Sequence, residues 1–283
     1  MLRRFHFVRH TWFLVLSVGL ALFLAMEAVL VVTGNINLLP TVILLGATLV
    51  PVTFVTYIYQ RVRVKEIPVA TIAVTVFLGG AIGLILAGLL EYATLRELGL
   101  LQLLGVSVIE ESAKLAIPAV LYLVGRYRTE ADGLLFGVAS GMGFAAMESM
   151  GYGLVSFLQS QGSIGALQLT LLVRALFAPV GHAAWTGLLC AVVWRERQRA
   201  GRRTINPAVI GAFLAAVLLH TAWNTMATLT DHTSIGWVGI EFGGLIAVGA
   251  VSLAILIRRM REAGLRHPSH FVTAVQNHAG PEF

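Results

Sequence analysis

An acidic pair and a lysine lie within an otherwise apolar stretch of the sequence. Glu110, Glu111 and Lys114 interrupt a run that extends from residue 100 to residue 124. Ionisable groups near the centre of a bilayer cost at least about 2.5–3.5 kcal/mol each on insertion scales. A chain keeps such groups where they pair with one another or take part in chemistry. On a helix, Lys114 lies one turn from both carboxylates, so it can hold one ionised while the other holds a proton.

The composition indicates a membrane protein that crosses the bilayer several times. The chain has 283 residues, of which 57% are hydrophobic and 12% charged, and its mean hydropathy is +0.83. Soluble domains contain about 25% charged residues. A spanning helix needs about 20 apolar residues, and runs of that kind predict an all-α polytopic bundle of about eight transmembrane helices. The runs lie at residues 12–33, 38–59, 69–90, 100–124, 133–157, 167–194, 207–229 and 235–257. The sixth contains Pro179, which can kink or split a helix.

Basic residues are concentrated in alternate loops. Arginine and lysine follow the second, fourth, sixth and eighth runs, whereas the loops between hold one basic residue, Arg96. By the positive-inside rule, both termini are expected to be cytoplasmic and the number of spans to be even. The same loops account for the net charge of +6, and no basic soluble segment indicates a nucleic-acid partner. The single cysteine, Cys190, excludes an intramolecular disulfide.

The runs divide the chain into four expected parts. Residues 1–99 supply three N-terminal spans, residues 100–230 the catalytic core of spans four to seven, residues 231–261 a last span, and residues 262–283 a cytoplasmic tail. The core is where the intramembrane polar residues are concentrated.

Polar residues of spans four to seven are expected at one depth. Glu110, Glu111 and Glu148 each lie about ten residues, or about 15 Å, from the outer end of a span. His220 has a similar depth, and His182 lies near the middle of the sixth span. We therefore expect a polar site in the core of helices four to seven. One turn from His220, on the same face, Asn224 adds a carboxamide, and the two side chains together can donate hydrogen bonds to a developing oxyanion.

The fifth span carries a stripe of small residues that leads to its glutamate. Gly133, Gly137 and Gly141 recur every four residues, and Phe144 and Glu148 continue the stripe. Small residues at this spacing allow close helix packing, so Glu148 is expected to face a tightly packed interior.

Other polar residues in the apolar runs are less clearly placed by the sequence. Arg174 can pair with a carboxylate of the site or extend outward to the interface. Ser140 is expected to be a small packing residue, and Glu27 and Glu241 stand alone on their helices, peripheral to the site.

Four motifs in series resemble those of the PrsW family of intramembrane proteases, within the wider clan of the CAAX prenyl proteases. They are Glu110-Glu111-x-x-Lys114, Gly143-Phe144-x-x-x-Glu148, Pro179-x-x-His182 and His220-x-x-x-Asn224. The resemblance covers residues 100–230. It implies a multi-spanning protease of the bacterial cytoplasmic membrane, and the family's founding role implies site-1 cleavage of a single-span anti-sigma factor. It also implies that the glutamates, the two histidines and Asn224 are the functional positions, although Ser149 stands where the family often has asparagine.

We expect peptide hydrolysis inside the bilayer, on a membrane-embedded protein substrate, without a cofactor. Glu110 or Glu111, held by Lys114, would activate a water. His220 and Asn224 would stabilise the oxyanion, while His182 and Glu148 would orient the water or protonate the leaving amine.

Other functions fit the same residues. In a zinc-dependent variant of the protease, His182, His220 and Glu148 would be the metal ligands. An ion-coupled or proton-coupled transporter also uses buried glutamate, lysine and histidine, but matched halves are not evident in this sequence. A non-catalytic scaffold leaves the cost of the polar cluster unexplained.

Overall fold

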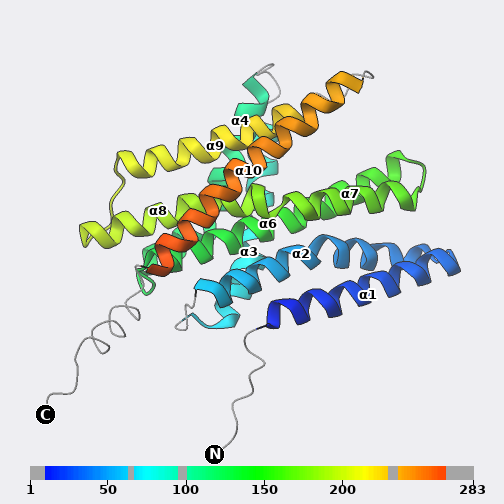
Figure 1. The fold of residues 1–283 in the computed structure, drawn as a ribbon, viewed down its shortest axis with the longest axis horizontal. Helices are drawn as coiled ribbons and strands as arrows, with labels where there is room; N and C mark the ends of the chain where they lie inside the picture. The colour runs from blue at the N-terminus through cyan, green and yellow to red at the C-terminus, as the bar shows by residue number, and fades with distance from the viewer. Residues whose placement is uncertain (1–9, 63–66, 95–100, 229–234, 266–283) are drawn as a thin grey trace, which may run out of the picture.

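The computed structural model describes residues 10–62, 67–94, 101–228 and 235–265, and side chains are described for these except 235–241 and 265. The described elements are α1 (Thr11–Thr33), η2 (Ile36–Leu38), α2 (Leu39–Val62), α3 (Val69–Thr94), α4 (Gln102–Lys114), α5 (Ala116–Val124), α6 (Glu130–Gln159), α7 (Ile164–Phe177), η5 (Pro179–Ala183), α8 (Ala184–Ala200), α9 (Pro207–Thr228) and α10 (Ile235–Leu265). They form an all-α bundle (Figure 1), and 7 helical segments in the described ranges are long and apolar enough to cross a membrane.

The predicted fourth span is the one that differs from expectation, because it is divided at Leu115 into α4 and α5. Pro118 has no N–H to donate to the carbonyl of Lys114, four residues earlier, so the helical ladder is interrupted there. Ser140 of α6 donates to that carbonyl instead, with an Oγ–O distance of 2.6 Å. Ser140 is fully buried, which agrees with its expected packing role and adds a hydrogen bond that holds the break.

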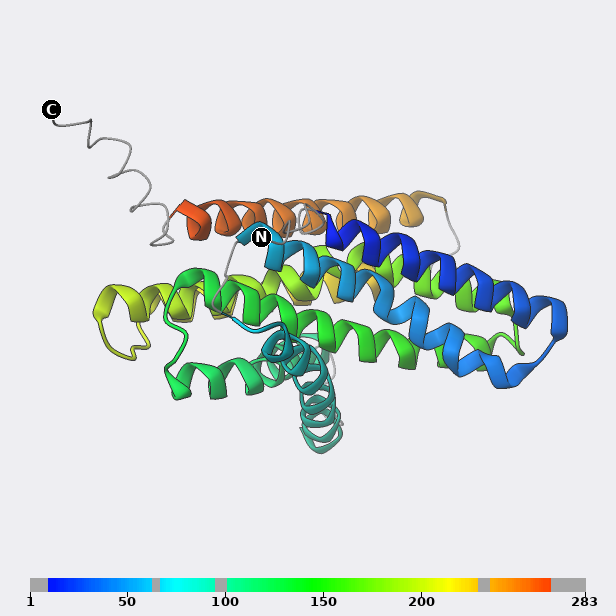
Figure 2. The ribbon, with the colours of Figure 1, turned by 90° about the horizontal axis from the view of Figure 1, so that it is seen from below.

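The break also changes the direction of the chain. Figure 2 shows α3 and α4, in cyan and teal, projecting together from one side of the bundle, while α5 runs along it. The single span predicted over residues 100–124 therefore consists of two helices that run in different directions. Counting residues inward from its end does not give the depth of Glu110 and Glu111.

The predicted sixth span is one long segment with an irregular turn in its middle. α7, η5 and α8 follow one another, and residues 164–200 count as a single candidate span. Pro179 opens the π-helical turn η5, in which Ala183 N–H donates to the carbonyl of Ala178 at 3.4 Å. Such single π turns occur often at functional sites, and this one contains His182.

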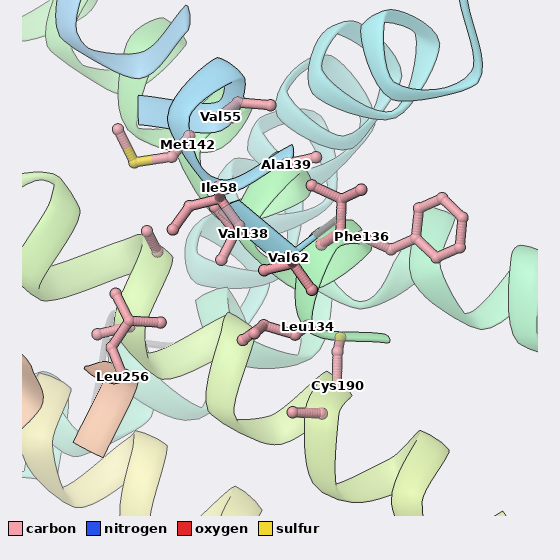
Figure 3. Packing of buried hydrophobic residues seen from close by; sticks show 14 of the residues in the cluster. Val55, Ile58, Val62, Leu134, Phe136, Val138, Ala139, Met142, Cys190 and Leu256 are labelled. Carbon is pink, nitrogen blue, oxygen red and sulfur yellow. The ribbon is translucent and has the colours of Figure 1, made fainter. Parts of the chain in front are cut away.

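α6 is the central helix, and its glycines allow the close packing that the sequence predicts. A methyl group on Gly137 would lie 2.5 Å from the carbonyl oxygen of Thr186, and one on Gly141 would meet the carbonyl of His182. The helix bearing Thr186 and the turn bearing His182 therefore approach the backbone of α6 directly. Figure 3 shows the apolar packing around α6, where Val138 and Met142 lie among side chains of neighbouring helices.

Several of the long helices end at opposite ends of the bundle. α2, α8 and α10 end on one side of the bundle, and α1 and α6 end on the opposite side (Figure 1). Which end faces the cytoplasm stays a prediction from the basic residues. The expected tail at residues 262–283 lies outside the described residues from 266 onward.

Candidate active site

The two adjacent glutamates share one lysine within α4. Lys114 Nζ lies 3.1 Å from Glu110 Oε2 and 2.8 Å from Glu111 Oε1. The lysine side chain is fully buried, and its ammonium also lies 4.4 Å from the centre of the Phe144 ring of α6. A cation over a ring face is a favourable contact where water is excluded. Phe144, at the end of the glycine stripe, thus forms part of the wall of this cluster.

Glu111 is the more deeply enclosed of the two carboxylates. Its side chain has no exposed surface. Besides Lys114, it contacts His220 of α9, with 3.0 Å between Nδ1 and Oε1, and accepts a hydrogen bond from Thr186 Oγ1 at 3.2 Å. An ionised carboxylate is an acceptor only, so this contact assigns the imidazole hydrogen to Nδ1. Nε2 of a neutral His220 then carries a lone pair.

Glu110 differs from Glu111 in having fewer protein partners and some exposed surface. Its side chain is 10% exposed, and Oε2 lies 3.7 Å from Nε2 of His220. That separation is too long for a direct hydrogen bond. Glu110 thus faces the lone pair of an imidazole whose other nitrogen is held by Glu111.

Glu148 of α6 forms a second carboxylate–imidazole pair. Its Oε2 lies 3.2 Å from Nε2 of His182 and 2.6 Å from a guanidinium nitrogen of Arg174. Arg174 Nε also donates to Ser149 Oγ at 2.8 Å. Arg174 therefore pairs with a site carboxylate, which the sequence left undecided, and Ser149 supports that arginine.

The two pairs are neighbours in space. The rings of His182 and His220 are 5.7 Å apart between centroids and are inclined at 80° to each other. The residues that the sequence predicted to meet, from four separate runs, therefore lie together. Asn224 lies one turn beyond His220 on α9 and is half-buried, and among the described residues it makes no hydrogen bond to the cluster.

Sequence reasoning missed four side chains in or beside this cluster. Thr186 and Trp185 lie within an apolar run, as does Ser252 of α10, and nothing in their types distinguishes them from packing residues. Glu91 was assigned to a loop because the apolar run was ended at residue 90, whereas α3 continues to Thr94. A hydrophobic window that ran through single acidic residues would have included Glu91.

Glu91 adds a carboxyl group on α3, the helix that packs against α4. Its Oε1 atom is buried and has no hydrogen-bond partner among the described residues.

Of the two glutamates that the sequence places alone on their helices, one lies apart from the cluster and the other lies outside the described side chains. Glu27 is buried on α1, and α1 lies beside α2 at the edge of the bundle (Figure 1). The side chain of Glu241 lies outside the described residues.

The same side chains can be tested as a zinc site. Two ligand atoms about 2.1 Å from zinc in a tetrahedral site lie about 3.4 Å apart. The His182–Glu148 and His220–Glu110 contacts, at 3.2 and 3.7 Å, are each near that spacing. Within the described residues, however, no three His, Cys, Asp or Glu side chains form a group that could hold a metal ion. The donor types suit zinc, whereas their arrangement does not.

Comparison with known families agrees with the motifs. The model of the PrsW family intramembrane metalloproteases matches residues 67–257, which is more than half of the chain and includes every residue of the cluster as well as Asn224. The word metalloprotease in the family's name fits the zinc variant. No curated protein and no solved structure matches the chain. The chain belongs to the PrsW family of intramembrane metalloproteases.

Proposed function

We propose that the chain hydrolyses a peptide bond of a membrane-embedded protein, with Glu110 as the base that activates water. The observation that carries this proposal is the unequal environment of the two adjacent glutamates. All the contacts of Glu111 serve to hold it in place, whereas Glu110 is partly exposed and faces the lone pair of His220. A buried, fully bonded carboxylate is suited to orient its neighbours, and the accessible one to accept a proton.

In this mechanism a water lies between Glu110 and His220. The 3.7 Å between Oε2 and Nε2 leaves each atom able to accept a hydrogen bond from that water. Glu110 takes a proton as the water oxygen attacks the carbonyl carbon. The carbon–nitrogen bond then breaks, and the amine leaves with the proton that Glu110 returns.

The remaining residues have roles that follow from their hydrogen bonds. Because Nδ1 of His220 donates to Glu111, its Nε2 orients the water, and the oxyanion role expected of His220 passes to the amide of Asn224. The Nε2 hydrogen of His182 donates to Glu148, which Arg174 holds in place. This pair is well placed to bind the substrate backbone on the other side of the scissile bond.

The proposed substrate class is supported by the family and by the position of the site among apolar helices. We propose a single-span protein of the bacterial cytoplasmic membrane, and an anti-sigma factor is the candidate that the family's founding role suggests. Candidates can be found by expressing the chain in a bacterial host and sequencing the new protein N-termini that its membranes contain. Termini that require Glu110 define substrates and cleavage sites.

The decisive experiment compares variants of the purified protein on such a substrate, tagged at both ends and reconstituted in liposomes. Glu110→Gln should lower the cleavage rate by about 10²–10⁴-fold, the usual contribution of a general base. Ser107→Ala, a buried change one turn away on the same helix, should keep activity. Full activity in both Glu110→Gln and His220→Ala would refute the assignment. Proton-coupled flux without any cleavage would favour the transporter.

The zinc variant needs a separate measurement. The metal content of active, purified protein should be determined, and activity should be followed during treatment with a strong chelator. A stoichiometric metal whose removal abolishes cleavage, and whose return restores it, would replace the metal-free mechanism. Unchanged activity of metal-free protein would support Glu110 acting on water directly.

A further inference from the structure

A buried tryptophan contacts both histidines of the site. Trp185, in the first turn of α8, is 1% exposed. Its ring stacks on His220, with 4.6 Å between centroids and 23° between planes, and meets His182 edge-on at 5.7 Å. The terminal torsion of a histidine side chain is broad and only weakly restricted by its own geometry. The indole plane therefore limits how the His220 ring can turn.

The orientation of the indole is itself fixed from a distant helix. Trp185 Nε1 donates to Ser252 Oγ of α10 at 2.9 Å, and Ser252 is also 1% exposed. An indole N–H is a donor only and needs an acceptor when buried. A phenylalanine and an alanine would fill similar space without burying two polar groups, which costs free energy unless they pair. The hydrogen bond between the two side chains therefore fixes the orientation of the indole, and it links α10 to the site.

We propose that Trp185 and Ser252 are positioning residues, which hold the His220 ring so that Nδ1 meets Glu111 while Nε2 faces Glu110. A rotation of the imidazole would break the 3.0 Å contact to Glu111 and turn the lone pair away from Glu110. Neither residue needs to touch the substrate. The proposal rests on the proposed function, because it assigns these residues an effect on the same reaction.

The test is a double-mutant cycle on the purified, reconstituted protein with the doubly tagged substrate. Trp185→Phe keeps an aromatic ring but removes the N–H, and Ser252→Ala removes its acceptor. Each should lower kcat by about tenfold with little change in KM, because the positioning acts on the reacting atoms rather than on substrate binding. The double variant should be no worse than either single one, and Ser252→Thr, which keeps a hydroxyl, should restore activity.

Trp194→Phe is the matched control. Trp194 lies on the same helix, is equally buried, and donates its N–H to the carbonyl of Tyr127, away from the site. Its variant should lose thermal stability without losing kcat. Wild-type kcat in both Trp185→Phe and Ser252→Ala, or an equal loss in Trp194→Phe, would overturn the proposal. Full activity in both Glu110→Gln and His220→Ala would instead refute the proposed function.

Discussion

Removing the buried lysine should have the largest effect of any single change at the site. Lys114 has no exposed side-chain surface and lies 3.1 and 2.8 Å from its two carboxylates. At about 3 Å, and with an effective dielectric constant of about 20, each contact is worth about 5 kcal/mol of Coulomb attraction before desolvation. Removing one partner of a buried ion pair costs about 3–5 kcal/mol in practice. Lys114→Met should therefore lower the melting temperature in detergent by on the order of 10 °C.

Two double variants separate the roles of the carboxylates. Glu111→Gln with Lys114→Met removes a charge of each sign from the most enclosed part of the site, so it should recover much of the lost stability but no cleavage. Glu110→Gln with Lys114→Met should recover less, because Glu110 retains some exposure. Stability is followed by thermal unfolding and activity by substrate cleavage. A Lys114→Met melting temperature within about 2 °C of that of wild type would refute this reasoning, because the expected loss of several kcal/mol corresponds to a larger shift.

Three further changes test the elements that hold the site. Ser140→Ala should lower the free energy of unfolding by about 1–3 kcal/mol, because it leaves a buried carbonyl unpaired. Adding Pro118→Ala supplies an N–H for that carbonyl and should recover part of the loss in thermal unfolding. An equal loss on Ser140→Ala with Pro118 and with Ala at position 118 would contradict the assignment. Gly141→Ala presses a methyl group against the π-helical turn and should reduce cleavage more than tenfold, whereas Gly151→Ala, on the same helix with open space around it, should not. Arg174→Met should lose most of the cleavage activity. Arg174→Lys should lose less, because lysine keeps the positive charge but cannot contact both partners as the guanidinium does. Cleavage rates of both variants identical to that of wild type would argue against a role for the ion pair.

The meeting of the polar residues could be predicted because intramembrane charge is expensive. Glu110, Glu148 and His220 lie in different apolar runs, and burying each alone would cost more than burying them together. That argument needs only the residue types and their positions in apolar runs, both of which a sequence contains. It does not identify which carboxylate is enclosed, since neighbouring residues on a helix differ in exposure only through the packing of other helices.

The path of the chain was less predictable than the site. Pro118 was read as part of a continuous apolar run, although a proline deprives the carbonyl four residues earlier of its donor. Whether a helix then kinks or breaks depends on what else can reach that carbonyl, and Ser140 comes from a different helix. Trp185 and Ser252 were missed for the same reason, because a hydrogen bond 67 residues apart in sequence leaves no local pattern.

The lysine's two ion pairs also bear on how this segment enters the membrane. Both are made within α4, at i,i+3 and i,i+4, so they can form as soon as that helix does. The nascent segment then presents one net negative charge rather than three separate ions. His220, the partner of Glu111 from 109 residues later in the chain, joins only after α9 has been synthesised. Charge burial can thus proceed in two stages during biogenesis, first within one helix and then by assembly of the bundle.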